Sequence, residues 1–168
     1  MSLPEVNDHA IASFRRFYSL LPRTTDAALT VLKIHLLVEE QVRAFVDERV
    51  RMPASVKSAR LDCYQAICLA EALSDDDIHP QIWEAARKLN KLRNDVAHNL
   101  EPKGAIEQMR SVCAMFGPRP GLAKSTGNQD VLDELSFAAS LMYNEISLHV
   151  KRKPADILQL VPNANSAP

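Results

Sequence analysis

Arg93, Asn94 and His98 place a fixed cation, an amide and an imidazole within six residues of this sequence. A planar guanidinium keeps its positive charge at any physiological pH, and an imidazole exchanges protons near neutral pH. Cleavage of a phosphodiester requires both groups, because negative charge develops on the phosphate oxygens while protons move. The segment therefore indicates a site directed at phosphate, with Arg93, Asn94 and His98 as its candidate catalytic residues.

A strongly amphipathic helix is expected to carry these three side chains. Its apolar positions recur every three or four residues, which predicts one buried stripe: Ile82, Ala86, Leu89, Leu92, Val96 and Leu100. Asn90, Asn94 and His98 are four residues apart and form one line on the polar side of the same helix.

The spacing also limits how the candidate residues meet. Residues five apart on a straight helix lie about 140° apart around its axis, so Arg93 and His98 do not touch directly. Either the helix end is distorted near residues 96–99, or the two groups approach a bound phosphate from different sides. A structural alternative remains open: His98 would interact with the carbonyl end of the helix, and Arg93 would pair with a carboxylate of another helix.

Helical periodicity extends over most of the remaining chain. Most prolines fall where it stops, and all four glycines lie at position 104 or later. The pattern predicts six helices, at about 3–21, 26–51, 59–73, 80–101, 105–116 and 130–152. The second is the longest, and its wide apolar surface predicts a central position. We expect an all-α, up-and-down bundle that forms one domain over residues 1–152, with a flexible tail at 153–168 and an irregular stretch at 117–129.

Composition restricts the class of protein. With 168 residues and a formal net charge of -1, the chain is unlike a protein that binds polyanions over its whole surface. Its three cysteines form no CxxC pair, which favours reduced thiols in a cytoplasmic protein, and no apolar run reaches the length of a membrane span. His35 and Glu39 lie one turn apart, but two ligands do not make a metal site, so we expect a hydrogen-bonded pair, no metal and no cofactor.

The segment LRNDVAHN, residues 92–99, resembles the signature of HEPN domains, which is an arginine, often followed by a polar residue, and a histidine four to six residues later. Arg93, Asn94 and His98 match it, and the resemblance covers residues 26–116. It implies a metal-independent endoribonuclease that acts as a homodimer, often as a toxin or defence component, and cuts RNA by attack of the 2′-hydroxyl on the adjacent phosphate. His98 would then be the general acid or base, Arg93 would stabilise developing charge, and Asn94 would orient one of them.

Two further expectations accompany this resemblance. Arg87, Lys88 and Lys91 on the same helix would attract the RNA backbone, although a solvated basic face explains them equally. The chain is also similar to mannitol-operon-repressor-like proteins, through its long second helix, the LAEAL end of the third and KLNKLRNDVAH in the fourth. That similarity implies a non-catalytic bundle that binds a regulatory protein, whereas a toxin would bind an antitoxin.

Overall fold

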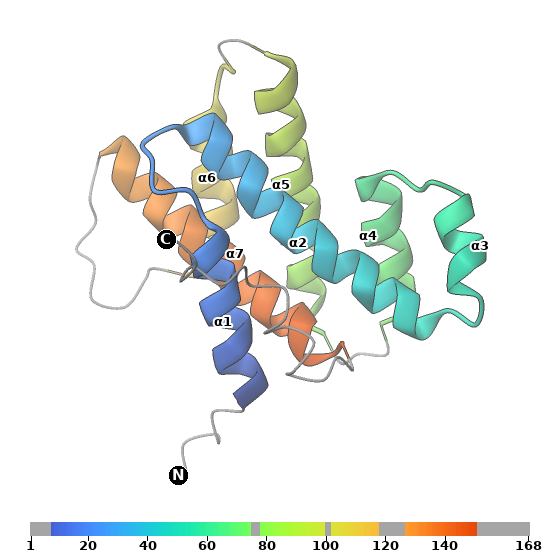
Figure 1. Ribbon diagram of the computed structural model, residues 1–168. Helices are drawn as coiled ribbons and strands as arrows, with labels where there is room; N and C mark the ends of the chain where they lie inside the picture. The colour runs from blue at the N-terminus through green and yellow to red at the C-terminus, as the bar shows by residue number, and fades with distance from the viewer. Residues whose placement is uncertain (1–7, 75–77, 100–101, 118–126, 151–168) are drawn as a thin grey trace, which may run out of the picture.

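Seven α-helices make up the described part of the chain, which comprises residues 8–74, 78–99, 102–117 and 127–150 of a computed structural model (Figure 1). These residues contain no strand, so the predicted all-α bundle is confirmed. In chain order the helices are α1 (Asp8–Leu20), α2 (Ala27–Arg49), α3 (Pro53–Ser58), α4 (Cys63–Ala72), α5 (Pro80–His98), α6 (Ala105–Cys113) and α7 (Asn128–Leu148).

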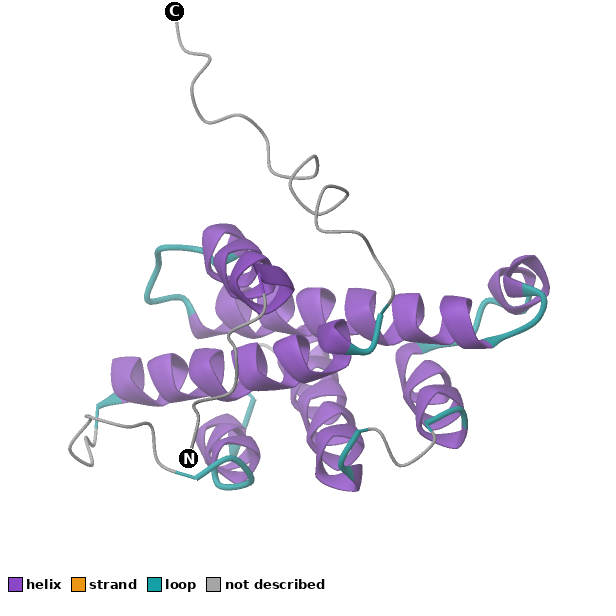
Figure 2. Cartoon of the chain, turned by 90° about the horizontal axis from the view of Figure 1, so that it is seen from below, coloured by secondary structure: helices purple, strands orange, loops and turns teal. Residues whose placement is uncertain are grey.

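The two longest helices, α2 and α7, lie side by side, and the other helices cover them (Figure 2). Their C-terminal ends lie together, since Arg49 donates a hydrogen bond from Nη1 to the carbonyl of His149 over 3.2 Å. In Figures 1 and 2, α4, α5 and α6 run across them on one side, and α1 packs on the other side against α7. The bundle is therefore organised around the α2 and α7 pair.

Helix α2 is buried on more than one side because it contacts α3, α4, α5 and α7. On this helix, Val31, Ile34, Val42 and Phe45 have no exposed surface. The predicted central position of this helix is confirmed. Because α4 and α5 both rest on α2, any side chain pointing between these three helices enters a common space.

A buried polar network fastens α1 to the rest of the bundle. Arg16 donates to the hydroxyl of Tyr143 at 2.7 Å and to the carboxylate of Glu40 at 2.9 Å. The hydroxyls of Ser13 and Ser147 lie 2.6 Å apart and are also buried. Polar groups shielded from water must be paired, so these contacts fix the register of α1 on α7 as well as its position.

The predicted third helix, 59–73, is wrong at its beginning. The chain forms the short helix α3 first and then turns at Arg60, whose φ of 51° lies in the left-handed region and breaks the helix. Asp62 restarts it, since its carboxylate accepts from the backbone N–H of Gln65 while the Gln65 side chain accepts from the backbone N–H of Asp62. This capping box begins α4 at Cys63.

The remaining boundaries differ by a few residues from those expected. Helix α5 begins at Pro80, and the His79 side chain caps it by accepting from the N–H of Gln81. The predicted tail at 153–168 lies outside the described residues, as do the beginning of the first predicted helix and most of 117–129. Among the helices that are described, none combines the length and the apolar character needed to cross a membrane.

The N-cap of α2 provides a test of this local structure. Asp26 accepts a hydrogen bond from the N–H of Leu29 at 3.0 Å, so Asp26→Ala is expected to lower the free energy of unfolding by about 1 kcal/mol. Urea denaturation followed by circular dichroism measures this loss. Thr25→Ala changes the exposed neighbour that does not cap the helix and should have less than half the effect. Equal losses in the two variants would contradict the assigned cap.

Candidate functional site

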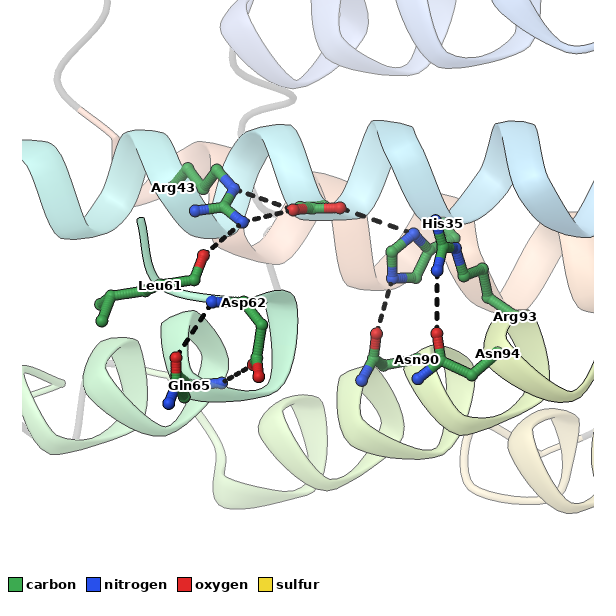
Figure 3. A network of polar contacts seen from close by, with 9 residues as sticks. His35, Arg43, Leu61, Asp62, Gln65, Asn90, Arg93 and Asn94 are labelled. Carbon is green, nitrogen blue, oxygen red and sulfur yellow. Dashed lines mark hydrogen bonds and ion pairs between the residues drawn. The ribbon is translucent and has the colours of Figure 1, made fainter. Parts of the chain in front are cut away.

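Helix α5 presents Asn90, Arg93 and Asn94 towards α2 and α4. Its apolar positions, such as Leu89 and Leu92, are fully buried in the core, which fixes the rotation of the helix about its axis. The three- and four-residue spacing then brings the three polar side chains onto one side. In Figure 3, Asn90 faces His35 of α2, and Asn94 is joined to Arg93.

These side chains line an open pocket of about 320 Å³ between α2, the beginning of α4 and α5. Every residue that lines it has a polar or ionisable side chain: His35, Glu39, Arg43, Asp62, Cys63, Tyr64, Asn90, Arg93 and Asn94. The pocket therefore favours a charged or strongly polar ligand over an apolar one.

A chain of polar contacts runs along the α2 wall of the pocket (Figure 3). His35 Nε2 lies 3.0 Å from Asn90 Oδ1, and His35 Nδ1 lies 3.6 Å from Glu39 Oε2, which is too long for a hydrogen bond. Arg43 holds the other carboxylate oxygen, donating to Glu39 Oε1 at 2.8 Å from Nε and 2.6 Å from Nη2. Arg43 Nη2 also donates to the carbonyl of Leu61 at 3.1 Å, which ties α2 to the segment before α4.

Burial dominates the protonation of two groups in this pocket. It lowers the pKa of His35, although the hydrogen bond to Asn90 and the charge of Glu39 act in the opposite direction. It raises the pKa of the Cys63 thiol to about 12, and the charge of Glu39 adds to the rise. His35 is therefore a neutral imidazole at pH 7, and Cys63 is a thiol in the absence of a partner that displaces its proton.

Arg93 is half-buried and makes no ion pair with any residue that the structure describes. Its Nη1 donates to Asn94 Oδ1 at 2.9 Å, so its nearest partner is a neutral amide. Arg87, by contrast, pairs with the carboxylate of Glu71. The guanidinium instead directs its positive charge into the pocket, where the charge acts on His35 and Cys63.

His98 lies apart from this pocket. It is the last residue of α5, its side chain is exposed, and no hydrogen bond or ion pair holds it among the described residues. Helix α5 is uninterrupted to His98, so the expected alternative of a distorted helix end is wrong. Arg93 and His98 of one chain would therefore have to act on a ligand from different sides.

The three basic residues predicted to attract RNA point in different directions. Arg87 pairs with Glu71 of α4, whereas Lys88 lies 3.6 Å from Glu84 and donates to Ser111 of α6 at 3.2 Å. Lys91 is exposed. Arg87 and Lys88 thus take part in helix contacts, and Lys91 is the member of the set whose charge faces solvent.

Several pocket residues were missed because they are distant in the sequence. Arg43, Asp62 and Cys63 belong to α2 and α4, and nothing in the pattern of α5 points to them. One signal was available, the one-turn spacing of His35 and Glu39. The sequence did not reveal that Cys63 lies beside this pair.

Comparison of the chain with family models, curated proteins and solved structures gave no match. The geometry of the pocket and of α5 therefore carries the functional argument.

Proposed function

We propose that this chain is a metal-independent endoribonuclease of the HEPN type, which cuts RNA by attack of a 2′-hydroxyl on the adjacent phosphate. The observation that carries the proposal is Arg93, a pocket-lining guanidinium with no carboxylate partner among the described residues. A guanidinium in this state has N–H donors available for the equatorial oxygens of a phosphate, where negative charge grows during the attack. Asn94 orients the guanidinium through the 2.9 Å hydrogen bond.

His98 performs the proton transfer in this proposal. Its exposed position at the end of α5 leaves the imidazole accessible to a substrate that lies across the helix end. One such histidine cannot be both the base for the 2′-hydroxyl and the acid for the leaving oxygen in the same step. A two-fold homodimer solves this, because a second copy of the chain supplies a second His98 at a shared cleft.

The reaction itself provides the test. Purified protein in EDTA should cleave RNA and leave a 2′,3′-cyclic phosphate, because the nucleophile belongs to the substrate and no metal takes part. An RNA of the same sequence with a 2′-O-methyl group at the cleavage position should resist. Failure to cut a varied set of RNAs, or equal cleavage of the methylated strand, would reject the proposal.

A non-catalytic regulatory bundle remains the second candidate, and exposed apolar side chains favour it. Leu36 on α2 is 57% exposed and Tyr64 at the pocket is 54% exposed. A contiguous exposed apolar surface marks a site that binds another protein, and in this candidate Leu36 and Tyr64 contribute to such a site. This candidate predicts that Leu36→Asp releases a co-purifying protein while His98→Ala does not. The nuclease proposal, with an antitoxin as partner, predicts that His98→Ala abolishes toxicity.

A further inference from the structure

Three side chains with metal-binding atoms converge at the pocket from two helices. His35 and Glu39 lie one turn apart on α2, and Cys63 is the first residue of α4. One ligand atom from each lies within 4.8 Å of the other two. A tetrahedral ion with bonds of about 2.0–2.3 Å requires ligand atoms roughly 3.3–3.7 Å apart. The 3.6 Å between His35 Nδ1 and Glu39 Oε2 already falls in that range.

The buried imidazole has one nitrogen that the fold leaves without a partner. His35 is 3% exposed, and its Nδ1 makes no hydrogen bond. With Nε2–H donating to Asn90 Oδ1, Nδ1 is unprotonated and its lone pair is directed at the side where Glu39 Oε2 lies. Two electron-rich atoms at 3.6 Å repel each other, and a cation between them removes both the repulsion and the missing contact.

A further contact holds two of these side chains in place, and the backbone of the third residue is also fixed. Asn90 fixes the His35 ring, and Arg43 holds Glu39 by Oε1, which leaves Oε2 free to bind. The capping box of α4 fixes the backbone at Cys63. Outer contacts of this kind are usual around metal ligands, where they set the tautomer and the orientation of each group.

We propose that His35, Glu39 and Cys63 bind a divalent transition metal, for which Zn²⁺ is the best match. Imidazole, thiolate and carboxylate together suit Zn²⁺ and exclude the oxygen-preferring Mg²⁺ and Ca²⁺. On binding, the Cys63 thiol forms the metal–sulfur bond and releases its proton to solvent. The negative charges of Glu39 and the thiolate balance the ion. Three protein ligands leave the fourth tetrahedral position open to the pocket, where water or an anion binds beside Arg93.

Metal binding is tested directly with Co²⁺, which reports its ligands by absorption. Titration of the chelator-treated full chain should show one ion per chain and the near-ultraviolet charge-transfer band of a cobalt–thiolate bond, and Zn²⁺ should displace the ion. Cys63→Ser should abolish the band. Cys68→Ser, a matched change on the same helix, should retain it. Asn90→Ala, which removes the hydrogen bond to His35, should weaken binding about 10- to 100-fold.

Three outcomes would overturn the site: no stoichiometric binding, a band that survives in Cys63→Ser, or a band that is lost in Cys68→Ser. Circular dichroism of each variant separates loss of ligand from loss of fold. His35→Gln offers a second ligand change if Cys63→Ser proves unstable. The result does not depend on the proposed nuclease activity, because binding is measured without RNA and RNA cleavage is measured in EDTA.

Discussion

Replacing Arg93 by alanine is expected to lower the rate of RNA cleavage by about 10²- to 10³-fold, the usual effect of removing one donor that stabilises a developing oxyanion. The side chain is half-buried, and its hydrogen bond among the described residues goes to Asn94, so the fold should be retained. The rate is measured at saturating and at limiting RNA. In the proposed reaction the guanidinium acts on charge that develops in the transition state, so kcat should fall more than KM rises.

Two variants sharpen this test. Arg93→Lys keeps the positive charge but loses the planar fork, so its rate should lie between those of the native protein and Arg93→Ala. Arg110→Ala removes an exposed arginine of α6 with the same change in net charge and should leave kcat unaltered. If Arg110→Ala slowed cleavage as much as Arg93→Ala, the effect would be general electrostatic attraction of RNA. The special role of Arg93 would then be wrong.

His98→Ala belongs to the same experiment and should lower kcat by about 10²- to 10⁴-fold, as expected for loss of a general acid or base. In the proposed dimer both copies of His98 serve one cleft, so a mixed dimer of the native chain and His98→Ala should be nearly as slow as the His98→Ala dimer. Half of the native activity in the mixed dimer would instead place a complete site in each subunit.

Much of this fold follows from apolar spacing. The periodicity of α2, α5 and α7 predicts their existence and their buried faces, because a helix with one apolar stripe has few ways to bury it. The division of the predicted helix 59–73 was not accessible in the same way. It depends on Arg60 adopting a left-handed backbone conformation, which arginine rarely does, and on Asp62 forming a capping box that competes with helix continuation.

The site was predictable only as far as α5 itself specifies it. The positions of Asn90 and Asn94 on one line follow from helix geometry, and the structure shows both at the pocket. The sequence does not predict that Asn90 is buried against His35. Asn90 lies on the polar side of the helical pattern, where side chains are expected to face solvent. Contacts between α2 and the beginning of α4 depend on the path that the chain takes between these two helices. Hydrophobic periodicity does not predict that path.

The core between α2 and α5 gives the largest expected change in stability. Trp83 is buried on α5, and its ring packs edge-on against Phe45 of α2 with centroids 5.3 Å apart. Trp83→Ala is expected to lower the free energy of unfolding by about 3–5 kcal/mol, because the removed ring leaves a cavity between the two helices. Urea denaturation followed by far-ultraviolet circular dichroism measures the change. Fluorescence would not serve, since Trp83 is the single tryptophan.

A phenylalanine at this position separates packing from hydrogen bonding. The indole Nε1–H of Trp83 has no hydrogen-bond partner among the described residues, so Trp83→Phe loses no such bond and removes an unsatisfied buried donor. Its cost should be less than half that of Trp83→Ala. Met52→Ala, at a side chain that is largely exposed, serves as the control and should change stability by less than about 0.5 kcal/mol. If Trp83→Phe lowered the free energy of unfolding as much as Trp83→Ala, the indole N–H would have a hydrogen-bond partner. Packing against Phe45 would then not be the main contribution of Trp83 to stability.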